Sequence, residues 1–320
     1  MIFDSHMDTP TELLRGRDIF SDAPSQQVDL PKLRRGGVDS AFFALYCSAE
    51  LSPDEATRHA LEMAGAVDRV IRESDGAFAK AFSPADIYAN QAKGKISLLL
   101  GMENASPIQE SLDLLDAFYC LGVRYITLTH NGDNSVADSA AEGNSWGGLS
   151  PFGKEVVARM NSLGIMIDLS HASDNTFWDC IELSEAPIVA THSCCRSLCS
   201  HRRNLTDDML RALKEKDGYV GINFYPYFLV DDPVGKVPGV SEIVDHIDHA
   251  VKLAGLNHVG IGSDYDGIEI TPAGLENVGC LPLVFKEMRR RGYSEKDISL
   301  ISGENLMTVF DRVIKCSKSM

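Results

Sequence analysis

We expect an α/β fold, a (β/α)₈ TIM-like barrel formed as a single domain over residues 1–320. Short apolar runs alternate with stretches of helical periodicity, and six of these runs end in histidine or an acid. Length alone would allow two domains, but barrels of this size are routinely one, and no Pro/Gly/Ser-rich linker interrupts the chain. An open doubly wound sheet is the alternative, weakened because no glycine-rich phosphate loop follows the first run.

Eight runs rich in apolar, β-branched or aromatic residues are expected to be strands. They are mostly continuous rather than alternating, which is typical of parallel strands covered on both faces. The expected strands are Ile2–Ser5, Ser40–Tyr46, Ile96–Leu100, Tyr125–Thr129, Met166–Ser170, Ile188–Thr191, Tyr219–Phe224 and Val259–Gly262.

Helices between the strands are predicted by start signals and by periodicity. Serine precedes a first-turn proline or acid at Ser52, Ser83, Ser150 and Ser294. After Ser52, apolar residues recur at three- and four-residue steps from Ala60 to Ile71, which indicates one buried helix face.

Composition and charge exclude several classes of protein. The formal net charge of -16 leaves no basic footprint for nucleic acid. The sequence has no run of 18 apolar residues, no signal-peptide pattern at its start and a polar end, so we expect no membrane partner and a cytoplasmic location. Its eight cysteines show no disulfide framework.

The strand ends carry residue types that bind metal. The endings are Asp4-Ser5-His6-Met7-Asp8, Gly101-Met102-Glu103, Leu128-Thr129-His130, Leu169-Ser170-His171, Ala190-Thr191-His192 and Gly262-Ser263-Asp264. Because the carboxyl ends of barrel strands meet on one face, we expect one shared site there. Period-two alternation places Asp4, His6 and Asp8 on the same side of the first strand.

These ligands exceed what one catalytic zinc ion needs, since such a site uses three protein ligands and one open position. His6 and Asp8 can hold one ion, and His171 and His192 suit zinc as well. The surplus predicts two ions, with Glu103 as the carboxylate that bridges them. Two such ions would share a hydroxide and polarise a carbonyl group together.

Further residues are expected to act on a substrate. Asp264 can move a proton from water to a leaving amine, with Asp266 as the less favoured alternative. His130 can stabilise an oxyanion, although a metal-ligand or purely structural role stays open. An arginine fork in the loop after the sixth strand can hold a carboxylate, and Arg202 and Arg203 are nearly equivalent in this respect.

Other features have weaker interpretations. The long polar segment Asn131–Gly148 is either a functional loop, with Trp146 as a wall of the substrate pocket, or a mobile surface loop. His246 and His249 are expected on a polar helix face. Cys194, Cys195 and Cys199 match no standard metal spacing. Asp168 is expected to support other groups or to be structural.

The ordered set of motifs resembles the membrane dipeptidase (renal dipeptidase) family, the M19 metallopeptidases, over nearly the whole chain. The motifs are Asp-Ser-His-Met-Asp-Thr-Pro at residues 4–10, Gly-Met-Glu-Asn at Glu103, Tyr-Ile-Thr-Leu-Thr-His at His130, Leu-Ser-Pro-Phe-Gly at residues 149–153, Ile-Asp-Leu-Ser-His at His171, Thr-His-Ser at His192, Arg-Arg-Asn at Arg203, Gly-Ser-Asp-Tyr-Asp-Gly at Asp264 and Gly-Glu-Asn-Leu at residues 303–306.

The resemblance implies a metal-dependent hydrolase barrel with two Zn²⁺ ions per chain, other divalent metals being possible. By motif, His6 and Asp8 would bind one ion, His171 and His192 the other, and Glu103 both. His130 and Arg203 would contact the substrate, and Asp264 would be the proton shuttle. The implied substrates are dipeptides, including those with a C-terminal D-residue, and a homodimer is expected.

The sequence also departs from the family. It lacks the signal and lipid-anchor tail of the mammalian members and so looks like the soluble bacterial type. Two alternatives stay open. One is an amidohydrolase of the same barrel type acting on a non-peptide amide, cyclic amide or lactone. The other is a non-enzymatic metal-binding or sensory protein that uses the cysteines.

Overall fold

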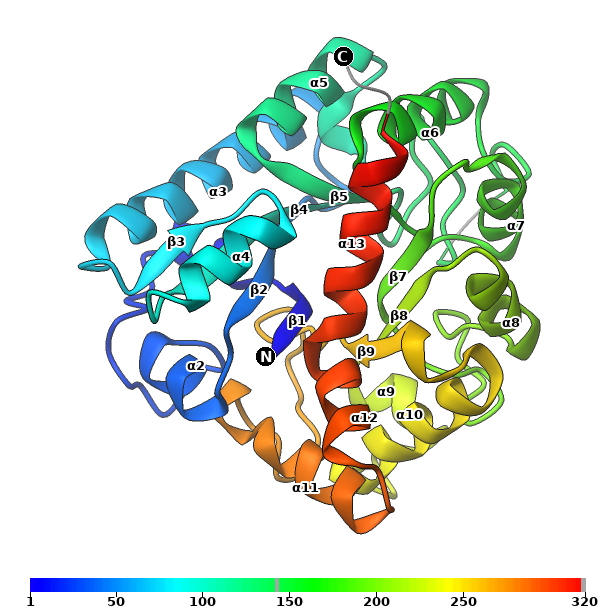
Figure 1. The fold of residues 1–320 in the computed structure, drawn as a ribbon. Coiled ribbons are helices and arrows are strands. Elements are labelled where there is room, and N and C mark those ends of the chain that lie inside the picture. The colour runs from blue at the N-terminus through cyan, green and yellow to red at the C-terminus, as the bar shows by residue number, and fades with distance from the viewer. Residues whose placement is uncertain (142–143, 318–320) are drawn as a thin grey trace.

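The computed structural model of the chain describes residues 1–141 and 144–317. Eight parallel strands form a nearly closed barrel in their sequence order (Figure 1), which confirms the predicted fold. The strands are β1 (Phe3–Met7), β2 (Ser40–Tyr46), β4 (Ile96–Glu103), β5 (Val123–Thr127), β6 (Met166–Asp168), β7 (Ile188–Ser193), β8 (Tyr219–Ile222) and β9 (Val259–Ile261). Each expected run therefore contains a strand, with ends that differ by a few residues.

A ninth strand, β3 (Phe78–Lys80), corrects the sequence interpretation. It pairs in parallel with Ile96–Leu98, the first part of β4, whereas β5 pairs with the later part from Leu100 onward. The connection from β2 to β4 thus contains β3 between α3 (Pro53–Glu73) and α4 (Pro84–Gln91), the two helices that the signals at Ser52 and Ser83 predicted.

The barrel closes where β9 meets β1. Met7 and Tyr265 form a parallel bridge there. On either side of this bridge, the Asp8 amide donates to Tyr265 O at 2.9 Å and the Asp264 amide donates to His6 O at 3.0 Å. The seam of the barrel therefore brings the end of the first strand beside the segment that follows the last one.

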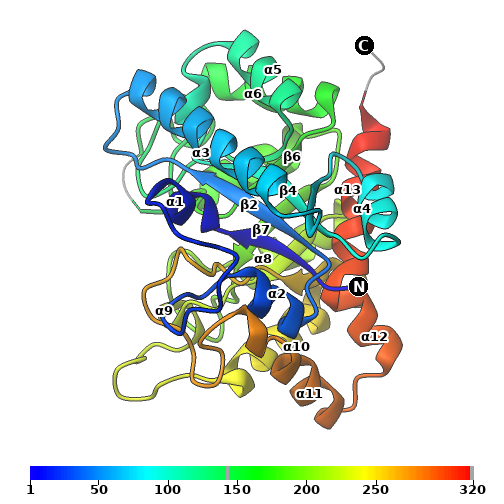
Figure 2. The same ribbon diagram turned by 90° about the vertical axis from the view of Figure 1, so that its left-hand side faces the viewer.

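Helices surround the barrel, as the ribbon in Figure 2 shows. The start signals at Ser52, Ser83, Ser150 and Ser294 are confirmed, because each of these serines is the N-cap of a helix. None of the helices within the described ranges is both long and apolar enough to cross a membrane. The remaining elements are α1 (Thr9–Leu14), α2 (Leu30–Gly36), η1 (Ser106–Ile108), α5 (Leu112–Leu121), α6 (Pro151–Leu163), α7 (Asp174–Leu183), α8 (Asp207–Glu215), α9 (Pro226–Leu229), α10 (Val240–Ala254), η2 (Leu256–His258), η3 (Val278–Cys280), α11 (Pro282–Arg290), α12 (Glu295–Ser299), the π-helical turn η4 (Leu300–Glu304) and α13 (Asn305–Cys316).

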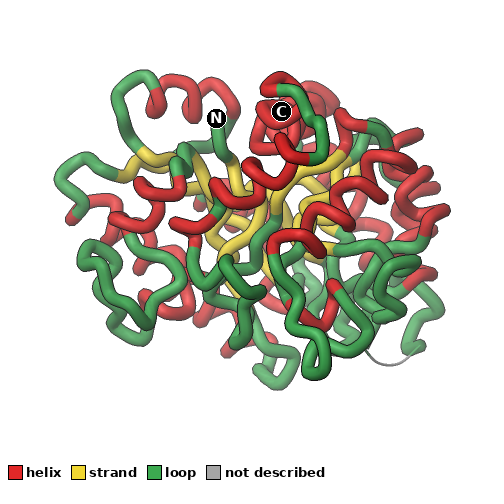
Figure 3. Tube along the Cα trace, turned by 90° about the horizontal axis from the view of Figure 1, so that it is seen from below, coloured by secondary structure: helices red, strands yellow, loops and turns green. Residues whose placement is uncertain are grey.

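The last helix, α13, covers the amino-terminal end of the barrel. It lies across the barrel in Figure 1, and its residues Phe310 and Val313 join a buried cluster with Phe42, Tyr125 and Tyr219 of the strands. Loops gather on the face away from both termini (Figure 3). The carboxyl ends of the strands therefore open toward these loops, where a barrel of this kind places its functional site.

Candidate metal centre and substrate cavity

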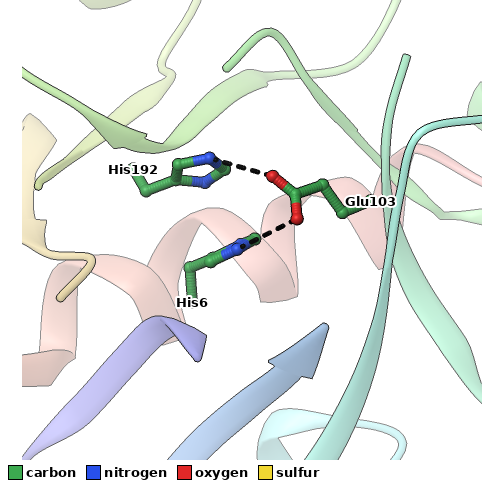
Figure 4. A group of neighbouring side chains, drawn as sticks. All are labelled: His6, Glu103 and His192. Carbon is green, nitrogen blue, oxygen red and sulfur yellow. Dashed lines mark ion pairs between the residues drawn. The ribbon is translucent and has the colours of Figure 1, made fainter. Parts of the chain in front are cut away.

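Four predicted ligands from four strands converge at the loop-bearing end of the barrel. His6 lies in β1, Glu103 ends β4 and His192 lies in β7, whereas His171 lies just beyond the end of β6. All four are buried. In Figure 4 the imidazoles of His6 and His192 point toward the carboxylate of Glu103. The structure thus brings together residues that the chain separates by up to 186 positions.

The two oxygens of Glu103 face different histidines. Its Oε1 lies 3.1 Å from His171 Nε2 and 3.3 Å from His192 Nε2. Its Oε2 lies 3.6 Å from His6 Nε2. A carboxylate in this position can offer one oxygen to each of two neighbouring cations, which is what the sequence led us to expect of Glu103.

The outer nitrogen of each imidazole is held by a polar partner that sequence reasoning did not assign. The His6 Nδ1 lies 2.8 Å from the Tyr125 hydroxyl, and the His171 Nδ1 lies 3.1 Å from Asn131 Oδ1. The His192 Nδ1 lies 2.9 Å from Thr191 Oγ1. Because the outer nitrogens are engaged, all three rings present Nε2 to the centre, an arrangement common around metal-binding histidines.

Asp8 and Asp264 complete the cluster from the two sides of the seam. Asp8 Oδ2 lies 3.3 Å and Asp264 Oδ1 lies 3.8 Å from His6 Nε2. The other oxygen of Asp264 accepts a hydrogen bond of 2.8 Å from Asn223. Asp4 lies apart from this group, since its carboxylate accepts from the backbone amides of His6 and Ser263.

Asp266, the alternative to Asp264, is engaged elsewhere. Its carboxylate accepts hydrogen bonds from Arg17 at 2.5 Å and from Thr9 at 2.8 Å. These contacts connect α1 and the loop after it to the loop that follows β9. The geometry therefore favours Asp264 as the carboxylate that can act on a substrate.

Protonation in this cluster is governed by burial and by excess negative charge. Burial lowers the pKa of both His171 and His192, so these rings are neutral near pH 7. Burial also acts to lower the pKa of His6, but the charges of Glu103 and Asp8 outweigh it and raise that pKa well above its usual value. The acids of the cluster thus favour a positive charge at its centre.

The donor atoms fit divalent cations. Among the described residues, the buried atoms His6 Nε2 and Asp8 Oδ1 have no hydrogen-bond partner, although each is a donor or acceptor that burial should pair. The Nε2 atoms of the neutral rings His171 and His192 face each other at 3.1 Å. In three overlapping groups of described residues, the potential ligand atoms all lie within 4.8 Å of one another. The groups are His6, Glu103 and His192; Glu103, His130 and His171; and His6, Asp8 and Asp264. Imidazole nitrogens and carboxylate oxygens are ligand types that several divalent metal ions accept.

His130 lies beside this cluster, on the loop after β5. Its ring centroid is 4.3 Å from that of His171, and Tyr46 packs edge-on against it at 4.8 Å. Burial lowers its pKa, so the ring is neutral near pH 7. The side chain is partly exposed and lines the cavity above the cluster. This position is compatible with contact to a substrate and with metal ligation.

Surroundings distinguish the two candidate arginines. Both line the cavity, but Arg202 is exposed whereas Arg203 is 6% exposed. The Arg203 guanidinium lies over the Phe228 ring at 5.3 Å, and one of its amino groups donates to His192 O at 3.3 Å. Its Nε has no partner within the described residues. Arg203 is therefore a buried fork with an unused donor.

A cavity of about 910 Å³ lies over these groups. Asp8, Glu103, His130, His171, Arg203 and Asp264 all contribute to its wall, together with Tyr225, which precedes α9, and Phe228 in α9. Its size and mixed polar lining suit a small polar molecule.

Known proteins identify the family to which these features belong. The sequence profile described as membrane dipeptidase, peptidase family M19, matches residues 1–320. The chain belongs to this family. It is 36% identical over 303 residues to dipeptidase aclJ of Aspergillus oryzae, an alignment that covers 92% of this chain and 72% of that protein.

Solved structures agree with the assignment to M19. A metallopeptidase from Rhodobacter sphaeroides, liganded with a phosphinate mimic of the dipeptide L-Ala-D-Ala, has a TM-score of 0.92 and 30% identity, with 98% of this chain and 99% of that chain covered. Dipeptidase AC, a metallopeptidase of family M19, has a TM-score of 0.92 and 31% identity, with 98% of each chain covered.

One interpretation of another residue needs correction in this M19 chain, whereas the interpretation of the cysteines stands. His246 is buried rather than on a polar helix face: its Nδ1 accepts from the Cys195 amide and its Nε2 lies 3.0 Å from Leu229 O. Burial raises the pKa of the Cys194 and Cys195 thiols, and both thiols donate to backbone carbonyls. A thiolate metal site is therefore not favoured.

The segment Asn131–Gly148 is held by hydrogen bonds. Asp138 accepts from the amides of Trp146 and Gly148, and Asn134 donates to Leu128 O. Trp146 is 48% exposed, its indole donates to Asn134 O, and it is absent from the described cavity wall, to which this segment contributes Asn131 and Ala141. Trp146 is thus not the predicted pocket wall, while residues 142–143 of the segment lie outside the described residues.

Proposed function

We propose that this M19 family member hydrolyses the peptide bond of dipeptides, including those with a C-terminal D-residue, at a centre of two divalent ions, Zn²⁺ in the first instance. The observation that carries the proposal is Glu103, whose two oxygens face separate histidine sets below a cavity that also contains the buried fork of Arg203. The similar Rhodobacter sphaeroides protein bound to a dipeptide mimic supports this choice of substrate.

The proposed ligands form two sets, one on the side of each Glu103 oxygen. His6 and Asp8 would hold one ion, and His171 and His192 the other, with one oxygen of Glu103 directed to each. When bound, such a pair of ions supplies an activated water molecule and polarises the scissile carbonyl group.

The chain's own side chains orient the dipeptide and move a proton. The Arg203 guanidinium pairs with the free carboxylate in a two-point contact. The neutral His130 imidazole donates a hydrogen bond to the carbonyl oxygen as negative charge develops there. Asp264 takes a proton on its Oδ1 from the water whose oxygen bonds to the carbonyl carbon, and passes it to the departing amine as the C–N bond breaks. Asn223 holds the other oxygen of Asp264 in place.

Asp264→Asn tests the proton transfer. The amide is nearly isosteric, so both ions should remain bound, but it cannot accept the proton, and kcat should fall about 10²- to 10⁴-fold. Zinc content and turnover are measured on the same sample. A variant that cleaves Ala-D-Ala at the normal rate would rule out this role of Asp264.

A substrate screen tests the choice between a dipeptidase and an amidohydrolase with other substrates. Metal-replete protein is assayed with L,L- and L,D-dipeptides and with the same dipeptides carrying a C-terminal amide. Because Arg203 pairs with the carboxylate, amidation should abolish most of the activity. Equal cleavage of both forms would rule out the contact between Arg203 and the carboxylate, whereas no cleavage of either form would favour an amidohydrolase of non-peptide amides. The resemblance also leads us to expect a homodimer, which sedimentation of the loaded protein tests.

A further inference from the structure

Asp168 is a buried carboxylate that the mechanism above does not use. It ends β6 and accepts four hydrogen bonds. Its Oδ1 accepts from the backbone amides of Ser170 at 3.1 Å and Thr191 at 2.8 Å. Its Oδ2 accepts from the hydroxyls of Thr127 at 2.5 Å and Thr191 at 2.6 Å. All four hydrogens therefore point at this one carboxylate.

The Thr191 hydroxyl extends this network to the candidate metal centre. Its oxygen lies 2.9 Å from His192 Nδ1. A hydroxyl has one hydrogen, and that of Thr191 is donated to Asp168, so its oxygen can only accept from His192. The proton of the neutral His192 ring consequently resides on Nδ1. The Nε2 atom, 3.3 Å from Glu103 Oε1, is left with a free lone pair.

We propose that Asp168 is a positioning residue that fixes, through the Thr191 hydroxyl, the tautomer in which His192 offers Nε2 to a metal ion. The functional role of that tautomer rests on the proposed function, in which His192 is a metal ligand. The direction of the hydrogen-bond chain follows from Asp168 and Thr191 alone. Partners behind metal-binding histidines typically change metal affinity 10- to 100-fold.

Asp168→Asn keeps the shape of the side chain but should reverse the direction of the hydrogen bonds that link residue 168, Thr191 and His192. The backbone amides of Ser170 and Thr191 can only donate, so the amide oxygen of the variant must face them. Its NH₂ group then faces the two hydroxyls and donates to Thr191. The freed Thr191 hydrogen turns to His192 Nδ1, and the ring proton moves to Nε2, where it competes with the metal.

The first experiment measures the tautomer directly. Long-range ¹H–¹⁵N correlation spectra of the metal-free, full-length, ¹⁵N-histidine-labelled protein report which nitrogen of His192 carries the proton. We expect the Nδ1–H form in the unaltered chain and the Nε2–H form in Asp168→Asn. The same Nδ1–H form in both proteins would overturn the inference.

The second experiment measures zinc affinity by equilibrium dialysis with Zn²⁺ alone. Asp168→Asn and Thr191→Val should lower the affinity for one of the two zinc ions about 10- to 100-fold and leave the affinity for the other unchanged. Thr191→Ser keeps the hydroxyl and should restore the affinity. Thr127→Val is the matched control, because it removes the other hydroxyl from Asp168 but leaves the path to His192 intact.

The outcomes separate this inference from the proposed function. If Thr127→Val weakens zinc binding as much as Asp168→Asn does, Asp168 is only structural and the inference is wrong. If the unaltered protein binds no zinc, the proposed function fails. The tautomer of His192 still tests whether the hydrogen bonds from Asp168 through Thr191 fix the ring proton.

Discussion

At the scale of single residues, the adjacent Arg202 and Arg203 differ in what their environment allows. Arg203 is buried over Phe228, and its Nε has no partner in residues 1–141 and 144–317, so a carboxylate can complete its hydrogen bonds. Arg203→Lys keeps the charge but loses the planar fork. We expect KM for a dipeptide to rise about tenfold or more, equivalent to roughly 1.4 kcal/mol, with a smaller change in kcat.

The exposed neighbour provides the control for that prediction. Arg202→Lys makes the same chemical change on the same cavity wall, and steady-state kinetics should show little effect on KM. A larger effect from Arg202→Lys than from Arg203→Lys would assign the carboxylate contact to Arg202 instead.

The sequence could predict which strand ends carry the candidate ligands, but not how their side chains are supported. His171 and Asp264 adopt left-handed backbone with φ of 67° and 65°, a conformation that non-glycine residues rarely take. No local pattern indicates it, because it results from the loops around the site. Likewise, Tyr125 is an ordinary strand residue in sequence, and only the closed barrel places its hydroxyl on His6.

At the scale of elements, Gly101 in β4 makes room for the Tyr125 ring of β5. A Cβ at residue 101 would lie 2.0 Å from Tyr125 Cζ. Gly101→Ala must displace this ring, and with it the hydroxyl that holds His6. We expect a loss of stability of about 1–3 kcal/mol in urea unfolding and weaker zinc binding.

Gly65 in α3 is a matched control for Gly101. A Cβ there meets no atom of the described residues within 4 Å, and its helix position is exposed. Gly65→Ala should stabilise the protein by about 0.5–1 kcal/mol and leave zinc binding unchanged. A stable Gly101→Ala protein with unaltered zinc affinity would contradict the positioning role of Tyr125.

Arg290 and Arg291 at the end of α11 form an ionic network with Glu287 and with α10. Arg291 contacts Asp245 at 2.6 Å and Asp248 at 2.8 Å on α10, and Glu287 accepts from both Arg290 and Arg291. Hydrogen bonds from these arginines lower the pKa of Glu287 from 4.5 to about 2. Because the folded pKa is the lower one, this stabilisation is present above pH 4.5 and is lost as the pH falls toward 2.

Glu287→Gln should therefore lower Tm near neutral pH, with a difference from the unaltered chain that shrinks below pH 4.5 and vanishes near pH 2. High salt should shrink it as well, since its ion-pair partner Arg290 is 70% exposed. Glu155→Gln on the exposed face of α6 serves as the control. A Tm difference that grows in acid would contradict the assigned direction of the pKa shift.

Helices and strands with long sequence patterns could be predicted, whereas elements whose formation depends on tertiary contacts could not. Serine caps and apolar periodicity predicted the helices from Ser52, Ser83, Ser150 and Ser294. The strand Phe78–Lys80 was missed because three residues carry no periodic signal, and their pairing depends on the free edge at the start of β4.

At the scale of the whole molecule, stability and chemistry are placed at opposite ends of the barrel. The helix α13 closes the amino-terminal end, where Phe310 is fully buried and packs against Phe42 with ring centroids 5.9 Å apart. The candidate ligands lie at the carboxyl ends of the same strands. A cavity made by shortening a side chain at the amino-terminal end would not touch the ligands. It should therefore lower the free energy of unfolding and leave metal binding unchanged.

Phe310→Ala tests this separation. Removing a buried phenylalanine costs about 3–5 kcal/mol, which urea unfolding will measure, whereas zinc stoichiometry and affinity at 25 °C should match those of the unaltered chain as long as the protein is folded. Thr308→Ala, on the exposed side of the same helix, should leave both quantities nearly unchanged. If the folded Phe310→Ala protein loses a zinc ion, then the packing of the barrel floor reaches the strand ends, and the ligand geometry depends on α13 as well as on the loops that surround the site.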